Sequence, residues 1–310
     1  MTTSRFYVSF CSILILSLLA VSGAGCGQYV PEDYVKTTRT GGAIEAKYLA
    51  LGPSEVDYLE FPAPKPDEKH SVYFPKELRE DSGTRYPVVV LINGTGVLAS
   101  KYVALFHHLA SWGFVVVGNE DPSTGTGRSA DRALAFILGE NKREGSPFFG
   151  KIDEEKIGAS GHSQGGAGVF NAITSQEHSG LYKAAVALSP ANERLSRRSF
   201  PYDVTCVKAP TLMIGGTVGS FETKFVIPLS EMTRMYDRMT APKGMMRKKG
   251  YDHVRILCGA DGYATAWLRA WLCDDAEAMS AFSGESPEAL TNELYSDARF
   301  DLNDGRDARQ

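Results

Sequence analysis

The chain has 310 residues, of which 43% are hydrophobic and 23% charged, and its formal net charge is −4. This composition is typical of a globular protein with a well-buried core, and the charge gives no electrostatic reason to expect nucleic-acid binding. Nothing repeats at a fixed period, so the sequence does not indicate a repeat array.

The first 25 residues are typical of a signal peptide. Arg5 precedes an apolar run at residues 6–21, which has the length of a signal-peptide core and is short for a membrane span. We therefore expect an exported protein, either secreted or lipid-anchored to the cell envelope. The anchor would be a lipidated Cys26, because residues 23–26 resemble a bacterial lipobox, although Gly23 stands where an aliphatic residue is usual.

Beyond this segment the chain has three cysteines, Cys206, Cys258 and Cys273. In an exported protein two of them can form a disulfide, and the candidate pairs join Cys258 to Cys206 or to Cys273. None of the cysteine spacings is that of a metal-ligand pair, so we expect neither a metal nor a cofactor.

Residues 26–67 are studded with proline, which predicts an N-terminal segment and linker with an edge strand at residues 57–61. The main domain is expected at residues 68–284, beginning with strands at 70–74 and 86–92 that form a hairpin-like unit. After residue 284 we expect one short helix near Glu288 and then a disordered, charged tail to residue 310.

From residue 86 onward, predicted strands alternate with predicted helices. The strands are expected at residues 86–92, 114–117, 157–160, 184–188, 211–214 and 245–248, and helices at 101–112, 129–141, 229–239 and 261–272, with one more after residue 163. This alternation predicts an α/β fold, with a mostly parallel central sheet and helices on both faces. Ligands of such sheets bind beyond the carboxyl ends of the strands.

A Gly-x-Ser-x-Gly pattern follows one of these strands, with Ser163 at its centre between Gly161 and Gly165. A serine on a sharp turn between a strand and a helix projects its hydroxyl clear of the sheet, which is the geometry of a nucleophile elbow. The pattern alone occurs by chance, but here a strand-like run precedes it and small residues that suit a closely packed helix follow it.

A serine nucleophile needs a base and an acid that orients the base, and both are expected later in the chain. His253 alone among six histidines falls in a loop after the last predicted strand, so it is the candidate base. For the acid, Glu222 is the one carboxylate in the loop after residues 211–214. Glu193 is the alternative acid, and Asp252 is disfavoured because it adjoins His253.

Two backbone N–H groups are candidates for an oxyanion hole. Gln164 follows the serine at the start of the helix, and Thr95 lies in the glycine-rich loop 93–96 after the strand at 86–92. An ordinary glycine turn is the alternative explanation of that loop.

With these features placed, the chain resembles the α/β-hydrolases of the dienelactone hydrolase, cutinase-like polyester hydrolase and chlorophyllase group. The resemblance runs from about Tyr73 to Phe282, and its specific stretches are residues 87–96, 109–117, 150–153, 161–166 and 209–212. It implies an α/β-hydrolase fold without a lid domain. It also implies a serine esterase in which Ser163 is the nucleophile, His253 the base, and Thr95 and Gln164 the oxyanion donors.

The chain departs from this group at three positions. The aspartate of polyester hydrolases falls between Gly219 and Thr223, where Glu222 is the one acid, so we expect a longer side chain on a longer loop. The two aromatic residues that contact substrate in the group fall on Ala191 and Thr95. Activity on a bulky aromatic polyester is therefore not implied.

These features predict a monomeric serine hydrolase that acts on small-molecule or polymeric carboxylic esters through an acyl-enzyme intermediate. The alternative from another class is a catalytically silent hydrolase-fold binding protein at the cell surface, which the missing aspartate motivates.

Overall fold

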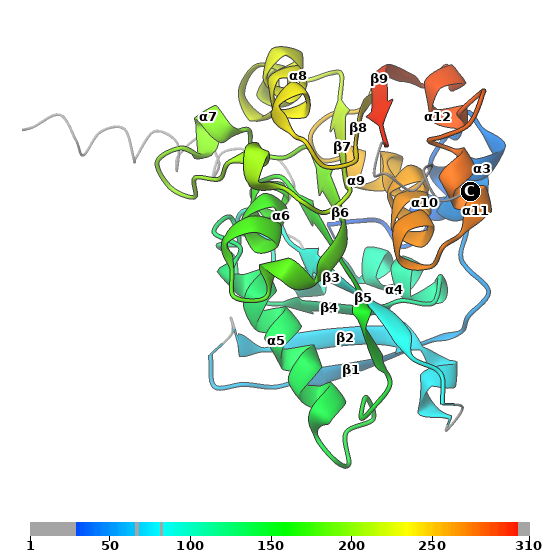
Figure 1. Cartoon of the computed structure of the whole chain (residues 1–310), viewed down its shortest axis with the longest axis vertical. Coiled ribbons are helices and arrows are strands. Elements are labelled where there is room, and N and C mark those ends of the chain that lie inside the picture. The colour runs from blue at the N-terminus through cyan, green and yellow to red at the C-terminus, as the bar shows by residue number, and fades with distance from the viewer. Residues whose placement is uncertain (1–28, 66–67, 81–82, 303–310) are drawn as a thin grey trace, which may run out of the picture.

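The computed structural model describes residues 29–65, 68–80 and 83–302, in which a central sheet carries helices on both faces (Figure 1). The predicted signal peptide, Cys26 and the last eight residues lie outside the described residues. The strands are β1 (Val56–Phe61), β2 (His70–Pro75), β3 (Tyr86–Ile92), β4 (Val115–Asn119), β5 (Ile152–His162), β6 (Tyr182–Leu188), β7 (Thr211–Gly216), β8 (Lys243–Lys248) and β9 (Tyr295–Asp301).

Helices fill most of the connections between these strands. The α-helices are α2 (Tyr34–Thr37), α3 (Ala43–Leu49), α4 (Val103–Ser111), α5 (Arg128–Lys142), α6 (Gln164–Ser175), α7 (Glu193–Ser196), α8 (Leu229–Arg238), α9 (Ile256–Gly259), α10 (Asp261–Leu272), α11 (Ala276–Ser280) and α12 (Glu288–Thr291). Short 3₁₀ turns occur at Lys76–Arg79, Ala99–Lys101, Ser179–Leu181 and Val204–Cys206, and a π-helical turn occurs at Phe221–Val226.

The strand order across the sheet is β1-β2-β4-β3-β5-β6-β7-β8-β9. All pairs from β4 to β8 are parallel, and the antiparallel pairs lie at the two edges. The predicted α/β fold with a mostly parallel sheet is therefore confirmed. The prediction that β2 and β3 form a hairpin-like unit is wrong, because β4 lies between these two strands in the sheet. Both faces of β2 are largely buried, and it pairs with the apolar strand β4, with Val72 opposite Val117.

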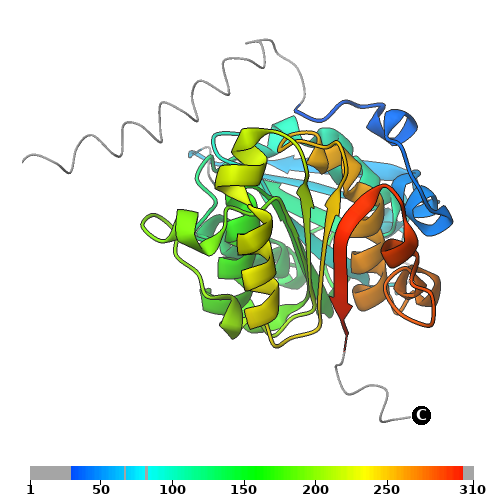
Figure 2. The same cartoon turned by 90° about the horizontal axis from the view of Figure 1, so that it is seen from above.

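Alternate residues of β3 show how the sheet separates two cores. Val88, Val90 and Ile92 pack with α5, α6 and α8 on one face, while Val89 and Leu91 pack with α4 and α10 on the other. Figure 2 shows the yellow α8 and the orange α10 on opposite sides of the strands. A strand that is buried on both faces must be apolar throughout, as β3 is.

The segment before residue 68 is part of the folded unit and not a linker. Helix α3 packs on α10, and β1 completes one edge of the sheet. Glu45 of α3 is buried, and its Oε1 accepts hydrogen bonds from Lys248 Nζ at 2.7 Å and from Tyr295 Oη at 2.9 Å. Asn292 donates to the other oxygen of Glu45 at 2.8 Å. The predicted domain start at residue 68 is therefore too late, because two short helices occupy the proline-free stretch 32–52, which the prolines on either side made resemble part of a linker.

The segment after residue 284 also differs from its prediction. The short helix was expected and lies at α12, but residues 295–301 form β9, which pairs antiparallel with β8. Figure 1 shows this red strand along β8, with the C-terminal helices beside the blue α3. From Asp297 onward, exposed charged residues of β9 alternate with less exposed ones. Because of these charged side chains, the sequence of β9 resembles that of a disordered tail.

All three cysteines of the described residues are free, so the expected disulfide is absent there. Cys258 lies in α9 and Cys273 caps the C-terminal end of α10. The twelve residues of α10 span about 18 Å, far more than the ~7 Å that a disulfide tolerates between Cα atoms.

Two absences hold for the described part of the chain. None of its helices has the length and apolar character that crossing a membrane requires. The connections after β6 and β7 contain only α7, α8 and short turns, so no lid domain is inserted between residues 189 and 242.

The buried pair of Glu45 and Lys248 gives a stability prediction. Glu45→Gln leaves the fully buried ammonium of Lys248 without its counter-charge, so we expect the free energy of unfolding to fall by about 3 to 5 kcal/mol. Urea denaturation at neutral pH measures the change. The matched control is Glu55→Gln, which breaks the solvent-exposed pair with Lys76 and should leave the denaturation midpoint unchanged. Equal midpoints for the two variants would contradict the role of Glu45.

Candidate active site

Ser163 lies on the turn between β5, which ends at His162, and α6, which begins at Gln164. Its φ of 60° and ψ of −119° are strained for a residue with a side chain. The flanking glycines permit this turn. A Cβ on Gly161 would lie 2.4 Å from the carbonyl oxygen of Gly165, and one on Gly165 would lie 2.2 Å from the carbonyl oxygen of Ile92.

Two hydrogen bonds join three side chains that are far apart in the sequence. Ser163 Oγ lies 2.9 Å from His253 Nε2, and His253 Nδ1 lies 2.7 Å from Glu222 Oε2. Since an ionised carboxylate only accepts, Nδ1 carries a proton, and Nε2 is then free to accept from the hydroxyl. The structure thus brings together Ser163, His253 and Glu222, which come from the ends of β5, β8 and β7.

Glu222 is fully buried but remains ionised because of its hydrogen bonds. Its Oε1 accepts from Ser189 Oγ at 2.6 Å and from the backbone N–H of Gly216 at 2.7 Å. Burial by itself raises the pKa of the carboxyl, but the contact with His253 and the bonds from Ser189 and Gly216 outweigh burial, so the pKa lies below its usual 4.5. A negative charge therefore faces His253 at neutral pH.

The longer loop expected around Glu222 is a π-helical turn. Phe221–Val226 includes a bond from the N–H of Ile227 to the carbonyl of Glu222, five residues apart. Such turns contain one more residue than an α-helical turn and are frequent at functional sites. This turn and the extra methylene of glutamate together let the carboxylate reach the imidazole.

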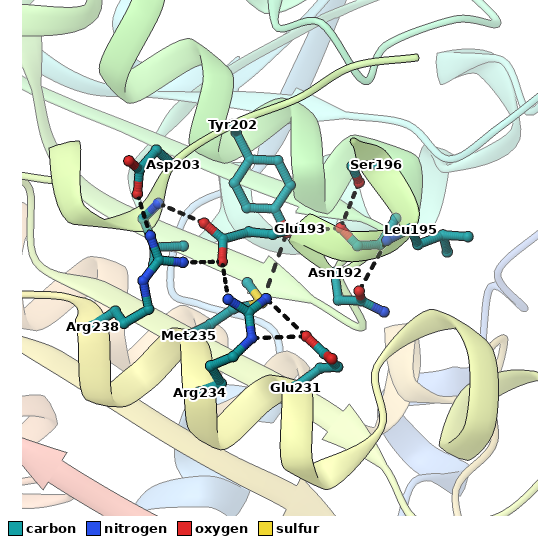
Figure 3. A network of polar contacts seen from close by, with 12 residues as sticks. Asn192, Glu193, Leu195, Ser196, Tyr202, Asp203, Glu231, Arg234, Met235 and Arg238 are labelled. Carbon is teal, nitrogen blue, oxygen red and sulfur yellow. Dashed lines mark hydrogen bonds and ion pairs between the residues drawn. The ribbon is translucent and has the colours of Figure 1, made fainter. Parts of the chain in front are cut away.

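Glu193, the alternative acid, lies in a different network (Figure 3). Its carboxylate accepts from the N–H of Val204 at 3.1 Å and pairs with Arg234 at 3.1 Å and with Arg238. The two arginines project from α8, and Arg238 also pairs with Asp203. Glu193 therefore joins the loop after β6 to α8, and no contact with His253 occurs among the described residues.

Asp252, the disfavoured acid, caps the turn that follows it. Its Oδ1 accepts from the backbone N–H groups of Val254 at 3.1 Å and of Arg255 at 2.9 Å. The carboxylate thus points along its own chain, and it fixes the start of the turn that carries His253.

The loop that contains Thr95 lies against the first turn of α6. A Cβ on Gly165 would lie 2.5 Å from the carbonyl oxygen of Asn93, so the loop and the helix start are in close contact. The N–H groups of Gly94 and Gly96 are bonded, to Tyr102 Oη at 3.0 Å and to the carbonyl of Pro122 at 2.9 Å. Within the described chain, the N–H of Thr95 has no such partner.

Gln164 presents the other candidate N–H, at the first position of α6. The N–H groups of a first helical turn have no partner within the helix and carry its positive end. The side chain of Gln164 faces away to the loop of Thr124, whose N–H donates to its Oε1 at 2.9 Å. This bond ties the start of α6 to the loop of Thr124.

Three side chains at the site were not singled out from the sequence. Ser189 supports Glu222, and the ring of Phe221 packs edge-on against His253 with 5.0 Å between centroids. His162 lies 4.6 Å from the ring of His253, centroid to centroid. Phe221 and His162 adjoin predicted site residues in the sequence, which was an available signal, whereas Ser189 had none.

Exposed apolar side chains occur on the segments that follow β6, β7 and β8, the strands after whose ends Glu222 and His253 also lie. Leu195 is 45% exposed and Phe225 is 55% exposed, and Asn192 Nδ2 donates to the carbonyl of Phe225 at 2.9 Å, which joins the segments that carry them. Val218 and Val254 flank the loop of His253, and each is 42% exposed. These residues form a partly apolar rim that suits an uncharged, apolar ligand.

Two other features are separate from this site. A cavity of 560 Å³ lies at the amino ends of central strands, away from the ends that carry the site, and is lined by Lys156, Tyr182 and other residues near the starts of β5 and β6. Asp131, Glu177 and His178 have ligand-type atoms within 4.8 Å of one another. Asp131 already accepts from both the N–H and Nδ1 of His178, at 3.0 Å each, so these two residues are paired with each other.

Comparison with known proteins agrees with the fold. The model of the PET hydrolase-like family matches residues 48–300. A bis(hydroxyethyl) terephthalate hydrolase of Streptomyces coelicolor is 31% identical over 150 residues, which are 47% of this chain and 43% of that protein. Two cutinases of Thermobifida alba, est2 and est1, are 26% and 29% identical over 66% of this chain and over 64% and 65% of their own lengths.

The matched regions therefore cover less than two thirds of each of these relatives. The family match, in contrast, extends over most of the chain, from within α3 to within β9, and includes Ser163, Glu222 and His253. On this evidence the chain belongs to the PET hydrolase-like family of α/β hydrolases.

Proposed function

We propose that this protein is a carboxylic ester hydrolase in which Ser163 is the nucleophile, His253 the general base and Glu222 the acid that orients it. The observation that carries the proposal is the chain of hydrogen bonds from Ser163 Oγ through His253 to Glu222, at 2.9 and 2.7 Å. Such a chain activates a hydroxyl that is otherwise a poor nucleophile.

The reaction follows from this geometry in two halves. Ser163 Oγ attacks the ester carbonyl while its proton passes to His253 Nε2, and the N–H groups of Thr95 and Gln164 stabilise the oxyanion. The tetrahedral intermediate collapses, the carbonyl carbon loses the alcohol, and His253 returns the proton to that leaving group. Water then attacks the acyl-enzyme by the same route and releases the acid and free Ser163.

The surroundings of the site favour an apolar ester. The exposed apolar side chains of Leu195, Val218, Phe225 and Val254 lie on the segments that follow β6, β7 and β8, the same strand ends that carry the site, and they suit an apolar ligand. The relatives named after terephthalate-ester and cutin hydrolysis also support an ester substrate of low polarity. We propose small esters and accessible polymeric esters as the substrate class.

The silent binding protein is the weaker alternative. This alternative rests on the missing aspartate, but Glu222 makes the contact with His253 that such an aspartate would make. For localisation we propose export, on the basis of the N-terminal apolar run, with a lipid-anchored form if Cys26 is modified.

A covalent probe tests the nucleophile directly. A fluorophosphonate should label the wild-type protein, and Ser163→Ala should abolish labelling because no other hydroxyl is paired with His253 in the described residues. The control is Ser175→Ala on the same helix, whose hydroxyl bonds to the carbonyl of Asn171 and which should leave labelling intact. Labelling that survives Ser163→Ala would rule out the assignment.

A matched pair of glutamate variants tests the acid. Glu222→Gln should lower kcat for a short p-nitrophenyl ester by about 10³- to 10⁴-fold, because the imidazole loses the charge that holds its tautomer. Glu193→Gln removes one charge from the Arg234 and Arg238 network and should change kcat by less than about threefold, since nothing in that network reaches His253. The reverse order of effects would assign the acid to Glu193.

A further inference from the structure

His162, the residue before Ser163, makes a hydrogen bond that the proposed reaction does not yet use. Its side chain is almost fully buried, and its Nε2 lies 2.7 Å from the carbonyl oxygen of His253. A carbonyl oxygen only accepts hydrogen bonds, so the proton of His162 is on Nε2.

The other ring nitrogen shows that His162 is neutral. Its Nδ1 is buried and has no hydrogen-bond partner within the described residues, so a second proton there would lack an acceptor. Burial and the neighbouring His253 both hold the pKa of His162 well below its usual 6.5. His162 is therefore a single donor of fixed direction.

The carbonyl of His253 has no other bond to the described chain, although the residues on either side are held firmly. Before it, the carbonyl of Tyr251 accepts from the N–H groups of Thr217 at 2.9 Å and Val218 at 3.2 Å. After it, Asp252 Oδ1 holds the next turn. Among the residues that the structure describes, the carbonyl of His253 is thus tied to the elbow by His162 alone.

We propose that His162 is a positioning residue that fixes the distance between Ser163 Oγ and His253 Nε2. Two consecutive residues of the elbow hold one residue of the distant loop, with His162 bonded to its main chain and Ser163 to its side chain. This inference rests on the proposed function, since it concerns how the base is aimed at the nucleophile.

The neutrality of His162 matters for the same step. When His253 takes the proton from Ser163 it becomes a cation, and the ring of His162 lies 4.6 Å away, centroid to centroid. A protonated, positively charged His162 would repel that cation at short range. A neutral donor holds the loop without this repulsion.

Variants of His162 in the full-length protein distinguish the effect of its hydrogen-bond donor from the effect of its ring volume. His162→Gln keeps a neutral N–H donor near the position of Nε2, while His162→Phe keeps the ring volume without a donor. His162→Asn stops short of the carbonyl and serves as a second variant without the contact. The matched control is His70→Phe, which replaces a buried histidine on β2, near the far edge of the sheet.

We expect His162→Phe and His162→Asn to lower kcat for p-nitrophenyl butyrate by about 10- to 100-fold with KM within about twofold, because small misplacements of reacting groups are costly. His162→Gln should recover kcat to within about fivefold of the wild type. His70→Phe should leave kcat unchanged. The melting temperature of each variant is measured as well, because it distinguishes a loss of folding from a misplaced His253.

The outcomes distinguish this inference from the function on which it rests. A wild-type protein that neither turns over esters nor reacts with a fluorophosphonate would overturn both. An active wild type with unchanged kcat in His162→Phe or His162→Asn would overturn the role of His162 alone. The role of His162 would also be overturned if His162→Gln had the wild-type melting temperature but a kcat as low as that of His162→Phe and His162→Asn.

Discussion

The close approach of the backbone around Ser163 is the constraint on which the site depends. The turn lies so near the end of β3 that a single methyl group on Gly165 would collide with the carbonyl of Ile92. Because of this contact, the start of α6 lies directly against the loop that contains Thr95. A looser turn would separate the hydroxyl from both the backbone N–H groups and the imidazole, whatever residues were present.

The contrast between Glu222 and Glu193 shows why residue type does not decide the acid. Both side chains are largely buried, and the two residues follow consecutive strands, β6 and β7. Glu193 faces two guanidinium groups from α8, which take up its charge locally. Glu222 faces one imidazole and two neutral donors, so its charge is available to His253. The neighbours that make this difference lie far away in the sequence.

The fold and the core of the site could be predicted because their signals are local. The apolar run of β3, the glycines around Ser163 and the position of His253 after the last parallel strand each occupy a few adjacent residues. The pairing of β2 with β4, the strand β9 and the support of Glu222 by Ser189 could not be predicted in this way. Each of these features depends on a contact between segments that are far apart in the sequence. In β9, the charged outward residues also mask the pattern of a paired strand.

The arrangement around Glu45 has a consequence for the order in which the chain folds. Its partners Lys248, Asn292 and Tyr295 all belong to the last quarter of the sequence, whereas Glu45 itself is among the first described residues. The carboxylate therefore remains without its native partners until almost the entire polypeptide has been made. Closing so long a loop is entropically costly and slow. We therefore expect the docking of α3 on the buried Lys248 to be a late event in folding.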